Sequence, residues 1–376
     1  MENEVLTIPN NVRFAALNPY LEDNIVKPVE KRTPGDEGRI LWGEKDLYPE
    51  YLVSLYENVP TLQSIIEGTV DFIAGDYVEV NIAQLLNMTD GDLAEQIRDL
   101  AGDVLIFGGF ALQVVRGRDG SVAEVYYIDI RKLRTNKDNT VFWYCDDWAA
   151  LFGQKEAIVY PAFMAELDWA TLTEEERNRH ASSILYIKTS NKKAYPVPRY
   201  AAAVKAAEIE KGIDNFHLNS LDNGFSASYI VNFNNGVPAD NIKEEIEENF
   251  TEKFSGHQNA GRVLMSWNNN KDCATTIERV PVDDFGDRYK ALSERSRQQL
   301  FTAFRANPNL FGIPTEGNGF ANEQYEESYK LYNRTVVRPL QKRICDAYDK
   351  IFGVEGLISI KPFSLAGNIE TEVQNG

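Results

Sequence analysis

Residues 103–115 read DVLIFGGFALQVV, and this stretch indicates a helix that stops at two glycines and continues as a strand. Apolar residues recur at helical spacing over 91–107, and Gly108-Gly109 ends that helix. Two strand-like segments joined by an RDG turn follow, at 111–115 and 122–128. A helix that leads into an antiparallel hairpin predicts an α+β fold.

Toward the N-terminus, the first forty residues are polar and rich in proline. They predict an extended, mobile arm over 1–40, with order beginning near Leu41. Apolar residues at helical spacing then predict two helices, one after Pro49 and one that runs from Pro60 to Gly75. Strands beyond the hairpin are expected at 140–145, 156–160 and 183–189.

Beyond residue 198, two long helices bracket a small unit. The helices are expected at 199–222 and 283–305, and the unit contains two strands, 227–233 and 261–267, around a helix at 239–254. Because the second long helix must return past the first, the small unit should project outward. A Gly-, Pro- and Asn-rich loop at 306–322 follows, and such a long polar loop is usually functional. A last helix at 323–352 should be kinked by Pro339.

The composition places the chain among globular proteins. It has 376 residues, 43% hydrophobic and 26% charged, which suggests two or three packed regions. Its net charge is −18, and residues 1–110 hold 20 acidic and 7 basic residues, a balance of −13. A high-affinity nucleic-acid binder needs a basic surface to neutralise phosphates. The charge therefore excludes tight gripping of DNA, but it allows the protein to surround DNA without sticking to it.

No catalytic motif is present in the sequence. The patterns GxxxxGK[ST], GxSxG and GxGxxG are all missing, and no apolar run approaches membrane-spanning length. The three cysteines and three histidines are scattered: Cys145, Cys273, Cys345, His180, His217 and His257. Asp146-Asp147 and Asp283-Asp284 have the chemistry of metal ligands, but exposed pairs at element ends are more typical of caps and turns. We therefore expect no catalytic residue, no metal and no cofactor.

Several motifs, taken in chain order, resemble the portal proteins of tailed double-stranded DNA phages. The motifs are DVLIFGGFALQVV (103–115), GSV (120–122), YIDIR (127–131), ILYIK (184–188), YPVP (195–198), NAGRVL (259–264), VPVDD (280–284), FRANPNLFG (304–312), NE (322–323) and RPLQK (338–342). The most telling is FRANPNLFG with the helix that follows it. Their order and spacing over residues 41–352 make the resemblance fairly specific.

The resemblance implies how a portal subunit is divided along this chain. The parts would be a flexible arm at 1–40, a wing at 41–198, stem helices at 199–224 and 282–305, a clip at 225–281, a tunnel loop at 306–322, a long kinked helix at 323–352, and a short tail or minimal crown at 353–376. The implied fold is α+β and portal-like, with a mixed α/β wing, a helical stem and a small α/β clip.

The same resemblance supplies candidate site residues. The tunnel loop would touch the DNA backbone through neutral groups, at Asn307, Asn309, Asn318, Asn322, Gly317 and Gly319. Cations of the second stem helix are candidates for the channel wall: Arg288, Lys290, Arg295 and Arg297. The clip would meet its partners through Glu244, Glu245, Glu248, His257 and Asn259. As an equally weighted alternative, Phe311 and Phe320 anchor the loop against neighbouring helices.

The implied function is that of a non-enzymatic ring, expected to be a dodecamer, at one vertex of the capsid. DNA would pass through it non-specifically during packaging and ejection. Expected partners are the terminase large subunit, a head–tail connector or adaptor, and the major capsid and scaffold proteins, with no membrane partner. The protein would be made in the bacterial cytoplasm and reside in the virion. Alternatives are another virion protein, such as an adaptor or minor capsid protein, and a metal-dependent nuclease using Asp146 or Asp147.

Overall fold

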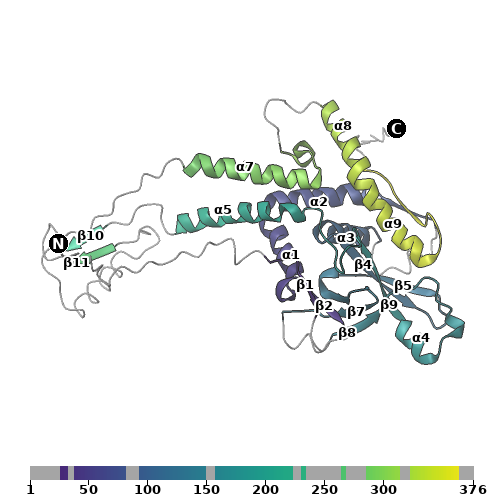
Figure 1. The fold of residues 1–376 in the computed structure, drawn as a ribbon. Helices are drawn as coiled ribbons and strands as arrows, with labels where there is room; N and C mark the ends of the chain where they lie inside the picture. Colours follow the sequence, from purple (N-terminus) through teal and green to yellow (C-terminus); the bar gives the residue numbers. More distant parts are fainter. Residues whose placement is uncertain are drawn as a thin grey trace, which may run out of the picture.

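The protein has a mixed α/β body from which two long helices project (Figure 1). The computed structural model describes residues 26–32, 38–81, 93–149, 157–222, 230–233, 264–267, 285–313 and 322–363. In the body, α2 and α3 lie between the sheets on one side and the α8–α9 segment on the other (Figure 1). This arrangement confirms the expected α+β fold class.

Three helices form the centre of the body: α1 (Tyr48–Asn58), α2 (Pro60–Ala74) and α3 (Leu93–Ile106). Proline occupies the first turn of both α1 and α2, where its missing N–H costs nothing. Helix α2 ends at Gly75, whose φ of 66° favours glycine, and a Cβ there would lie 1.9 Å from the Lys361 carbonyl oxygen. Leu52, Ile65 and Leu100 are fully buried, so these helices form the main core.

A three-stranded sheet follows α3, in the order β5-β4-β9. Its strands are β4 (Gly109–Arg116), β5 (Val122–Ile128) and β9 (Ser182–Lys188). The hairpin expected from the sequence is present; it pairs Ala111 with Ile128, and a bulge follows Val115. Gly108, with φ 87°, makes the sharp turn from helix to strand where a Cβ would lie 2.2 Å from the Val197 carbonyl oxygen.

A second, five-stranded antiparallel sheet has the order β1-β2-β6-β7-β8. Its strands are β1 (Glu30–Arg32), β2 (Arg39–Trp42), β6 (Leu133–Asn136), β7 (Val141–Tyr144) and β8 (Ile158–Pro161). Residues 30–32 and 39–40 therefore belong to this sheet and not to the arm expected over 1–40. Tyr195 holds them in place, because its ring stacks on Trp42 and its backbone N–H donates to the Glu30 carboxylate at 3.0 Å.

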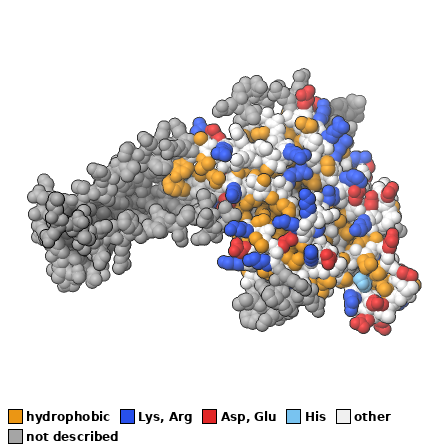
Figure 2. Space-filling view, viewed as in Figure 1, with side chains coloured by type: hydrophobic (Ala, Val, Ile, Leu, Met, Phe, Trp, Pro, Cys, Tyr) orange, Lys and Arg blue, Asp and Glu red, His pale blue; other side chains and the backbone are white. Residues whose placement is uncertain are grey.

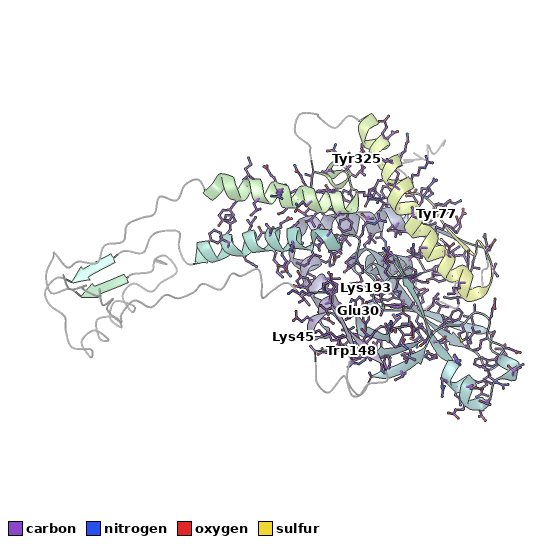
Figure 3. All side chains as sticks on the ribbon, in the orientation of Figure 1. Glu30, Lys45, Tyr77, Trp148, Lys193 and Tyr325 are labelled. Carbon is purple, nitrogen blue, oxygen red and sulfur yellow. The ribbon has the colours of Figure 1, made fainter. Side chains whose placement is uncertain are left out.

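A buried ion cluster ties this sheet to the turn before α1. Asp46 accepts from Arg134 Nε at 2.6 Å and from Arg39 at 3.1 Å, and both guanidinium groups lie 4.8 Å from the Trp148 ring centre. Arg134 is fully buried, and it also donates to the Asp46 carbonyl oxygen. Trp148 lies at the edge of the body away from α8 (Figure 3). The cluster is satisfied by its own groups, which is the condition under which buried charges are tolerated.

The projecting helices are α5 (Val204–Asp222) and α7 (Phe285–Phe304), which run side by side away from the body (Figure 1). Beyond them, β10 (Ile230–Phe233) pairs with β11 (Leu264–Trp267) in parallel. Parallel neighbours need a crossover connection, which fits the strand–helix–strand unit expected from the sequence. The helix expected at 239–254 lies outside the described residues.

The last long helix is interrupted. Helix α8 (Asn322–Tyr332) passes through a π-helical turn at Asn333–Val337 into α9 (Arg338–Phe352). The irregularity expected at Pro339 therefore lies just before it, where the Arg338 N–H reaches back to the Asn333 carbonyl oxygen. Proline has no N–H to continue the regular ladder, and a widened turn is one way to accommodate that loss.

Three further elements complete the fold. Strand β12 (Ile358–Ile360) pairs with β3 (Val78–Val80), so the segment after α9 returns to the end of α2. The short helix α4 (Glu174–His180) was not predicted, because it is polar throughout and lacks the apolar periodicity of the longer helices. A capping box between Thr173 and Glu176 starts it.

Candidate channel site

The beginning of the proposed tunnel loop is built against the body. After α7 ends, Pro308–Phe311 forms a short 3-10 turn, with Leu310 buried. The Asn307 side chain caps this turn by accepting from the Asn309 N–H at 3.1 Å, and its amide donates to Ser328 Oγ of α8 at 2.8 Å. Asn307 is thus engaged within the subunit, as a residue that fixes where the loop leaves the body.

Phe311 anchors the same turn in an aromatic cluster. Its ring centre lies about 6 Å from those of Phe72, Phe301 and Tyr332. Space for the ring exists because position 68 of α2 is glycine, where a Cβ would lie 2.9 Å from two Phe311 carbons. The structure therefore favours the anchoring role for Phe311. Phe320, Asn318, Gly317 and Gly319 lie outside the described residues, as does the side chain of Asn322.

The projecting helices are joined to the body by a second aromatic contact. Tyr200, just before α5, stacks on Phe304 at the end of α7, with ring centres 5.3 Å apart and both rings fully buried. The Tyr200 hydroxyl also donates to the Ile106 carbonyl oxygen of α3 at 3.1 Å. The end of α7, the start of the loop and the helical core are thus packed together.

The candidate stem cations occupy two faces of α7. Lys290, Arg295 and Arg297 are exposed, and the side chain of Arg288 lies outside the described residues. At 3.6 residues per turn, positions 290 and 297 share one face, while positions 288 and 295 share another about 150° away. Burial raises the pKa of Glu210 in α5, and Arg297 lies close enough for its charge to oppose that rise in part. The two pairs therefore point in different directions around α7.

Glu210 is the most unusual ionisable group at the base of these helices. It is 8% exposed, and its Oε1 accepts from Thr61 Oγ1 at 2.6 Å while Oε2 is buried without a hydrogen-bond partner. Burial raises the pKa of this carboxyl above its usual range. No local pattern in the sequence indicates this burial, since Glu210 stands in a helix with many surface charges.

The remaining candidates are engaged elsewhere or lie outside the described residues. Asp146 accepts from Lys132 Nζ and the Tyr144 hydroxyl, both at 2.8 Å, and Asp147 accepts from the Ala149 N–H in a turn. These are the turn and surface roles that the sequence favoured for this pair. The clip residues Glu244, Glu245, Glu248, His257 and Asn259 lie outside the described residues.

Two further observations concern the described ranges alone. Within them, no three His, Cys, Asp or Glu side chains are grouped so that they could hold a metal ion. None of the helices described is long and apolar enough to cross a membrane.

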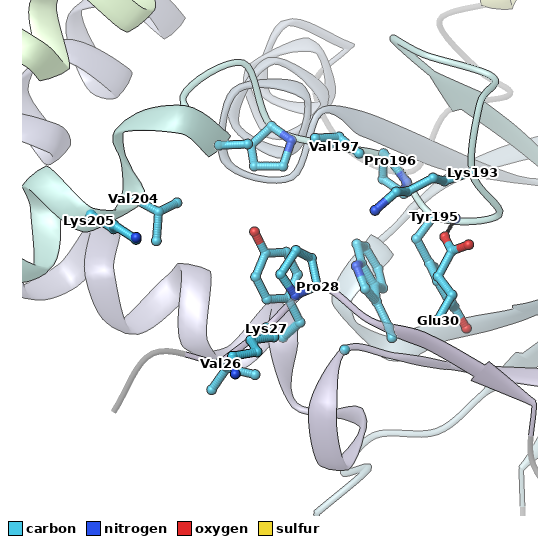
Figure 4. A pocket seen from close by; sticks show the side chains of 15 residues that line it. Val26, Lys27, Pro28, Glu30, Lys193, Tyr195, Pro196, Val197, Val204 and Lys205 are labelled. Atoms are coloured by element: carbon cyan, nitrogen blue, oxygen red, sulfur yellow. Dashed lines mark hydrogen bonds between the residues drawn. The ribbon is translucent and has the colours of Figure 1, made fainter. Parts of the chain in front are cut away.

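An apolar cavity of about 280 Å³ lies between the N-terminal segment and residues 193–205 (Figure 4). Its walls include Pro28, Trp42, Tyr48 and Pro196. None of the candidate site residues that the structure describes lines this cavity. The cavity lies between the β1 region and the start of α5, and Phe311 is not among its lining residues.

Comparison with known proteins fits this architecture. The family described as "Phage portal protein" matches residues 76–365. A curated relative, the "Probable portal protein" of Escherichia phage P2, is 22% identical over 244 residues, covering 64% of this chain and 63% of the relative. The chain thus spans less than two thirds of that relative's length.

Two solved structures share the fold. The neck of a native GTA (gene transfer agent) particle, computed with C12 symmetry, matches with a TM-score of 0.50 and 18% identity, covering 89% of this chain and 86% of that one. The neck of an empty GTA particle, computed with C6 symmetry, matches with a TM-score of 0.50 and 19% identity, covering 85% of each chain.

The chain belongs to the phage portal protein family. Of the possibilities left open by the sequence, the match supports the portal role over an adaptor, a minor capsid protein or a nuclease. The family is a structural, non-enzymatic one.

Proposed function

We propose that this protein assembles as a ring whose central channel carries double-stranded DNA into and out of a phage capsid. The observation that carries the proposal is the junction at the base of the projecting helices. There, α7, the anchored start of the loop and α8 are packed together through Phe311 and Asn307. Such a junction positions a loop at the base of a helical stem, which is where a channel lining is needed.

The ring is proposed to contain twelve copies, and the C12 symmetry of one structural neighbour supports this number. Residues 41–198 would be the wing, α5 and α7 the stem, and 225–281 the clip. The charge distribution suits a channel, because the net charge of −18 opposes tight phosphate binding and lets DNA slide. In this proposal the protein resides at the portal vertex of the virion.

The loop at 306–322 is proposed to line the narrowest part of the channel. Asn307 holds its beginning, so contact with the DNA backbone is proposed for the other candidates, Asn309, Asn318, Asn322, Gly317 and Gly319. Neutral amide and backbone groups would touch phosphates without reading bases. Deleting residues 315–320 should leave ring assembly intact and impair DNA packaging or retention. If the deletion abolishes rings while DNA handling in residual particles is normal, the loop is an assembly element.

The clip is proposed to dock the terminase large subunit during packaging and a head–tail connector afterwards. Reversing the charges of Glu244, Glu245 and Glu248 should weaken terminase binding and leave rings formed. A matched control reverses the exposed Glu166, Glu174 and Glu175 in and before α4, where no effect on terminase binding is expected. Equal terminase affinity in the clip variant and the wild type would exclude that helix face. Capsid and scaffold proteins are proposed to surround the wing.

The protein is proposed to turn over neither nucleotides nor DNA. The double variant Asp146→Asn and Asp147→Asn should support packaging as the wild type does, because these residues make surface and turn contacts. A metal-dependent cleavage activity that disappears in this variant would contradict the proposal.

A further inference from the structure

The outer face of the α8–α9 segment carries four regularly spaced cations. Lys330, Arg334, Arg338 and Lys342 follow one another at four-residue intervals, and all are exposed. The opposite face of the same segment is buried in the core: Tyr329, Tyr332, Val336, Leu340 and Ile344. Lys and Arg side chains gather over α8 and α9 in Figure 2. We call these four residues the basic ridge.

The two central members of the basic ridge are without an acidic partner among the residues that the structure describes. Lys330 pairs with Glu326 at 3.4 Å and Lys342 with Asp346 at 2.8 Å, both along the same helix. Within the described ranges, neither Arg334 nor Arg338 forms an ion pair. A guanidinium group offers donors in a planar fork that matches a carboxylate, so this pair is suited to an acidic partner.

A complementary surface lies between α2 and α3. A hollow of about 480 Å³ is lined by the carboxyl groups of Glu67, Asp71, Asp99 and Asp103, and Arg98 is the one cation among the described residues that line it. Arg98 is taken by Asp71 at 2.7 Å. Glu67 and Asp99 are exposed, and neither forms an ion pair in the described part of the chain. We call this surface the acidic hollow.

Two carboxyl groups of the acidic hollow also lie close to acidic side chains outside it. Partial burial and then the neighbouring charge of Glu95 raise the pKa of Asp99, and burial followed by the charge of Asp129 raises the pKa of Asp103. An incoming cation would relieve the repulsion between these groups and favour their charged forms.

The basic ridge and the acidic hollow face different sides of the subunit. On α2, Gly68, Thr69 and Phe72 contact the loop anchor and α8, whereas Glu67 and Asp71 line the hollow. The helical repeat places these two groups about 125° apart around α2. The ridge in turn lies on the side of α8–α9 that points away from α2. Two complementary surfaces on different sides of one chain are what a head-to-tail ring contact requires.

We propose that the basic ridge of one copy docks into the acidic hollow of the next copy around the ring. Arg334 and Arg338 pair across this contact with Glu67 and Asp99. The inference rests on the proposed ring and names the surface through which neighbouring subunits recognise each other. Charge pairs at the centre of an interface fix its register and suppress wrong partners, which a closed ring needs.

A charge-exchange experiment tests the contact. The variants Arg334→Glu/Arg338→Glu and Glu67→Lys/Asp99→Lys should each raise the concentration needed for half-maximal ring assembly at least about tenfold, because like charges then meet across the interface. The chain that carries all four substitutions should recover ring assembly, since complementarity is restored. The control Arg179→Glu/Lys192→Glu makes the same charge change at exposed positions outside both surfaces and should assemble like the wild type. Native mass spectrometry measures the assembly, and circular dichroism checks the fold.

A neutral variant tests the hollow without changing charge. Gly102 lines it, and a Cβ at this position meets nothing within 4 Å. Gly102→Gln should therefore leave the subunit folded, with slightly better helix propensity, while its side chain obstructs the hollow. Reduced ring assembly in this variant supports the contact.

The possible outcomes distinguish a failure of the proposed contact from a failure of the proposed ring. Rings of unchanged stability in Arg334→Glu/Arg338→Glu would overturn the contact and leave the proposed ring intact. Unchanged rings that retain less DNA would overturn it in favour of a ridge that faces DNA. A wild-type protein that never forms rings would overturn the proposed function and this contact together.

Discussion

The body and the projecting helices differ in how their side chains are paired and buried within a single subunit. In the body, even charged groups are internal, as in the cluster of Asp46 with two arginines on Trp148. Along α5 and α7, Phe216, Leu218 and Leu292 are 44%, 59% and 37% exposed, and the body also carries exposed apolar side chains, such as Leu331 at 65% and Ile158 at 53%. Figure 2 shows hydrophobic side chains on the described part of the projecting helices. The ion cluster is complete within the body, whereas apolar surface on α5 and α7 is left exposed in the single subunit, and we infer that neighbours in the ring cover it.

The largest expected effect is the loss of stability when the body's ion cluster is broken. Arg134→Ala should lower the free energy of unfolding by about 3–5 kcal/mol, because it leaves the Asp46 carboxylate buried with an incomplete set of partners. Urea denaturation measures the loss. The control Arg179→Ala, at an exposed pair, should cost less than about 1 kcal/mol. Equal losses in the two variants would mean that the cluster does not stabilise the body.

Substituting two phenylalanines, one where α7 meets the body and one further along α5, tests this difference between the body and the projecting helices. Phe304→Ala should cost about 3 kcal/mol, since that ring is fully buried where α7 meets the body. Phe216→Ala, further along α5, should cost the isolated subunit less than about 1 kcal/mol, because much of this ring is already exposed. Phe216→Ala should instead weaken ring assembly. If Phe216→Ala destabilises the subunit as strongly as Phe304→Ala, the stem is not dependent on its neighbours.

A smaller effect concerns pH. Burial raises the folded-state pKa of Glu210 above its ordinary value, so the folded protein holds this proton more tightly than the unfolded chain. The associated stability is fully present below the unfolded-state pKa and is lost as the pH rises through the folded-state pKa. Glu210→Gln should remove this part of the pH dependence in denaturation curves measured from about pH 4 to 8. Parallel pH profiles for the variant and the wild type would contradict the assignment.

The smallest expected effect concerns the reactivity of the Cys345 thiol toward an alkylating reagent. Burial, with nearby Asp349 and Asp346, raises the pKa of the Cys345 thiol in α9 to about 11. At neutral pH the thiolate should be about a hundredfold scarcer than for an exposed cysteine with an unshifted pKa. Alkylation of Cys345 by iodoacetamide, followed by peptide mass spectrometry, should therefore be far slower in native than in denatured protein. Comparable rates would show that α9 does not close over the thiol.

Local patterns made much of the fold predictable. The helices α1, α2 and α3 and the β4–β5 hairpin have strong periodicity and stop signals such as Gly75 and Gly108, and all were expected from the sequence. The short strands β1, β2, β3, β6 and β12 were missed because three or four residues carry little pattern, although β7 and β8, with four residues each, were expected. The π-helical turn lies before Pro339 and not at it, because the backbone adjusts in the turn that precedes the proline.

The features of the candidate site were less predictable, because they depend on contacts between distant residues. Asp46 and Arg134 are 88 positions apart, and nothing in either local sequence indicates their pairing. The aromatic anchor of Phe311 depends on Gly68, in a helix far earlier in the chain. The acidic hollow likewise combines residues of α2 and α3 that only the packing of the two helices brings together.

Electron microscopy of the purified wild-type protein tests the central claim most directly. The account predicts closed rings with a central channel, and two-dimensional class averages should show twelve subunits with the stem around the channel. A protein that remains monomeric at micromolar concentration and moderate salt, with no ring in any class, would contradict the account.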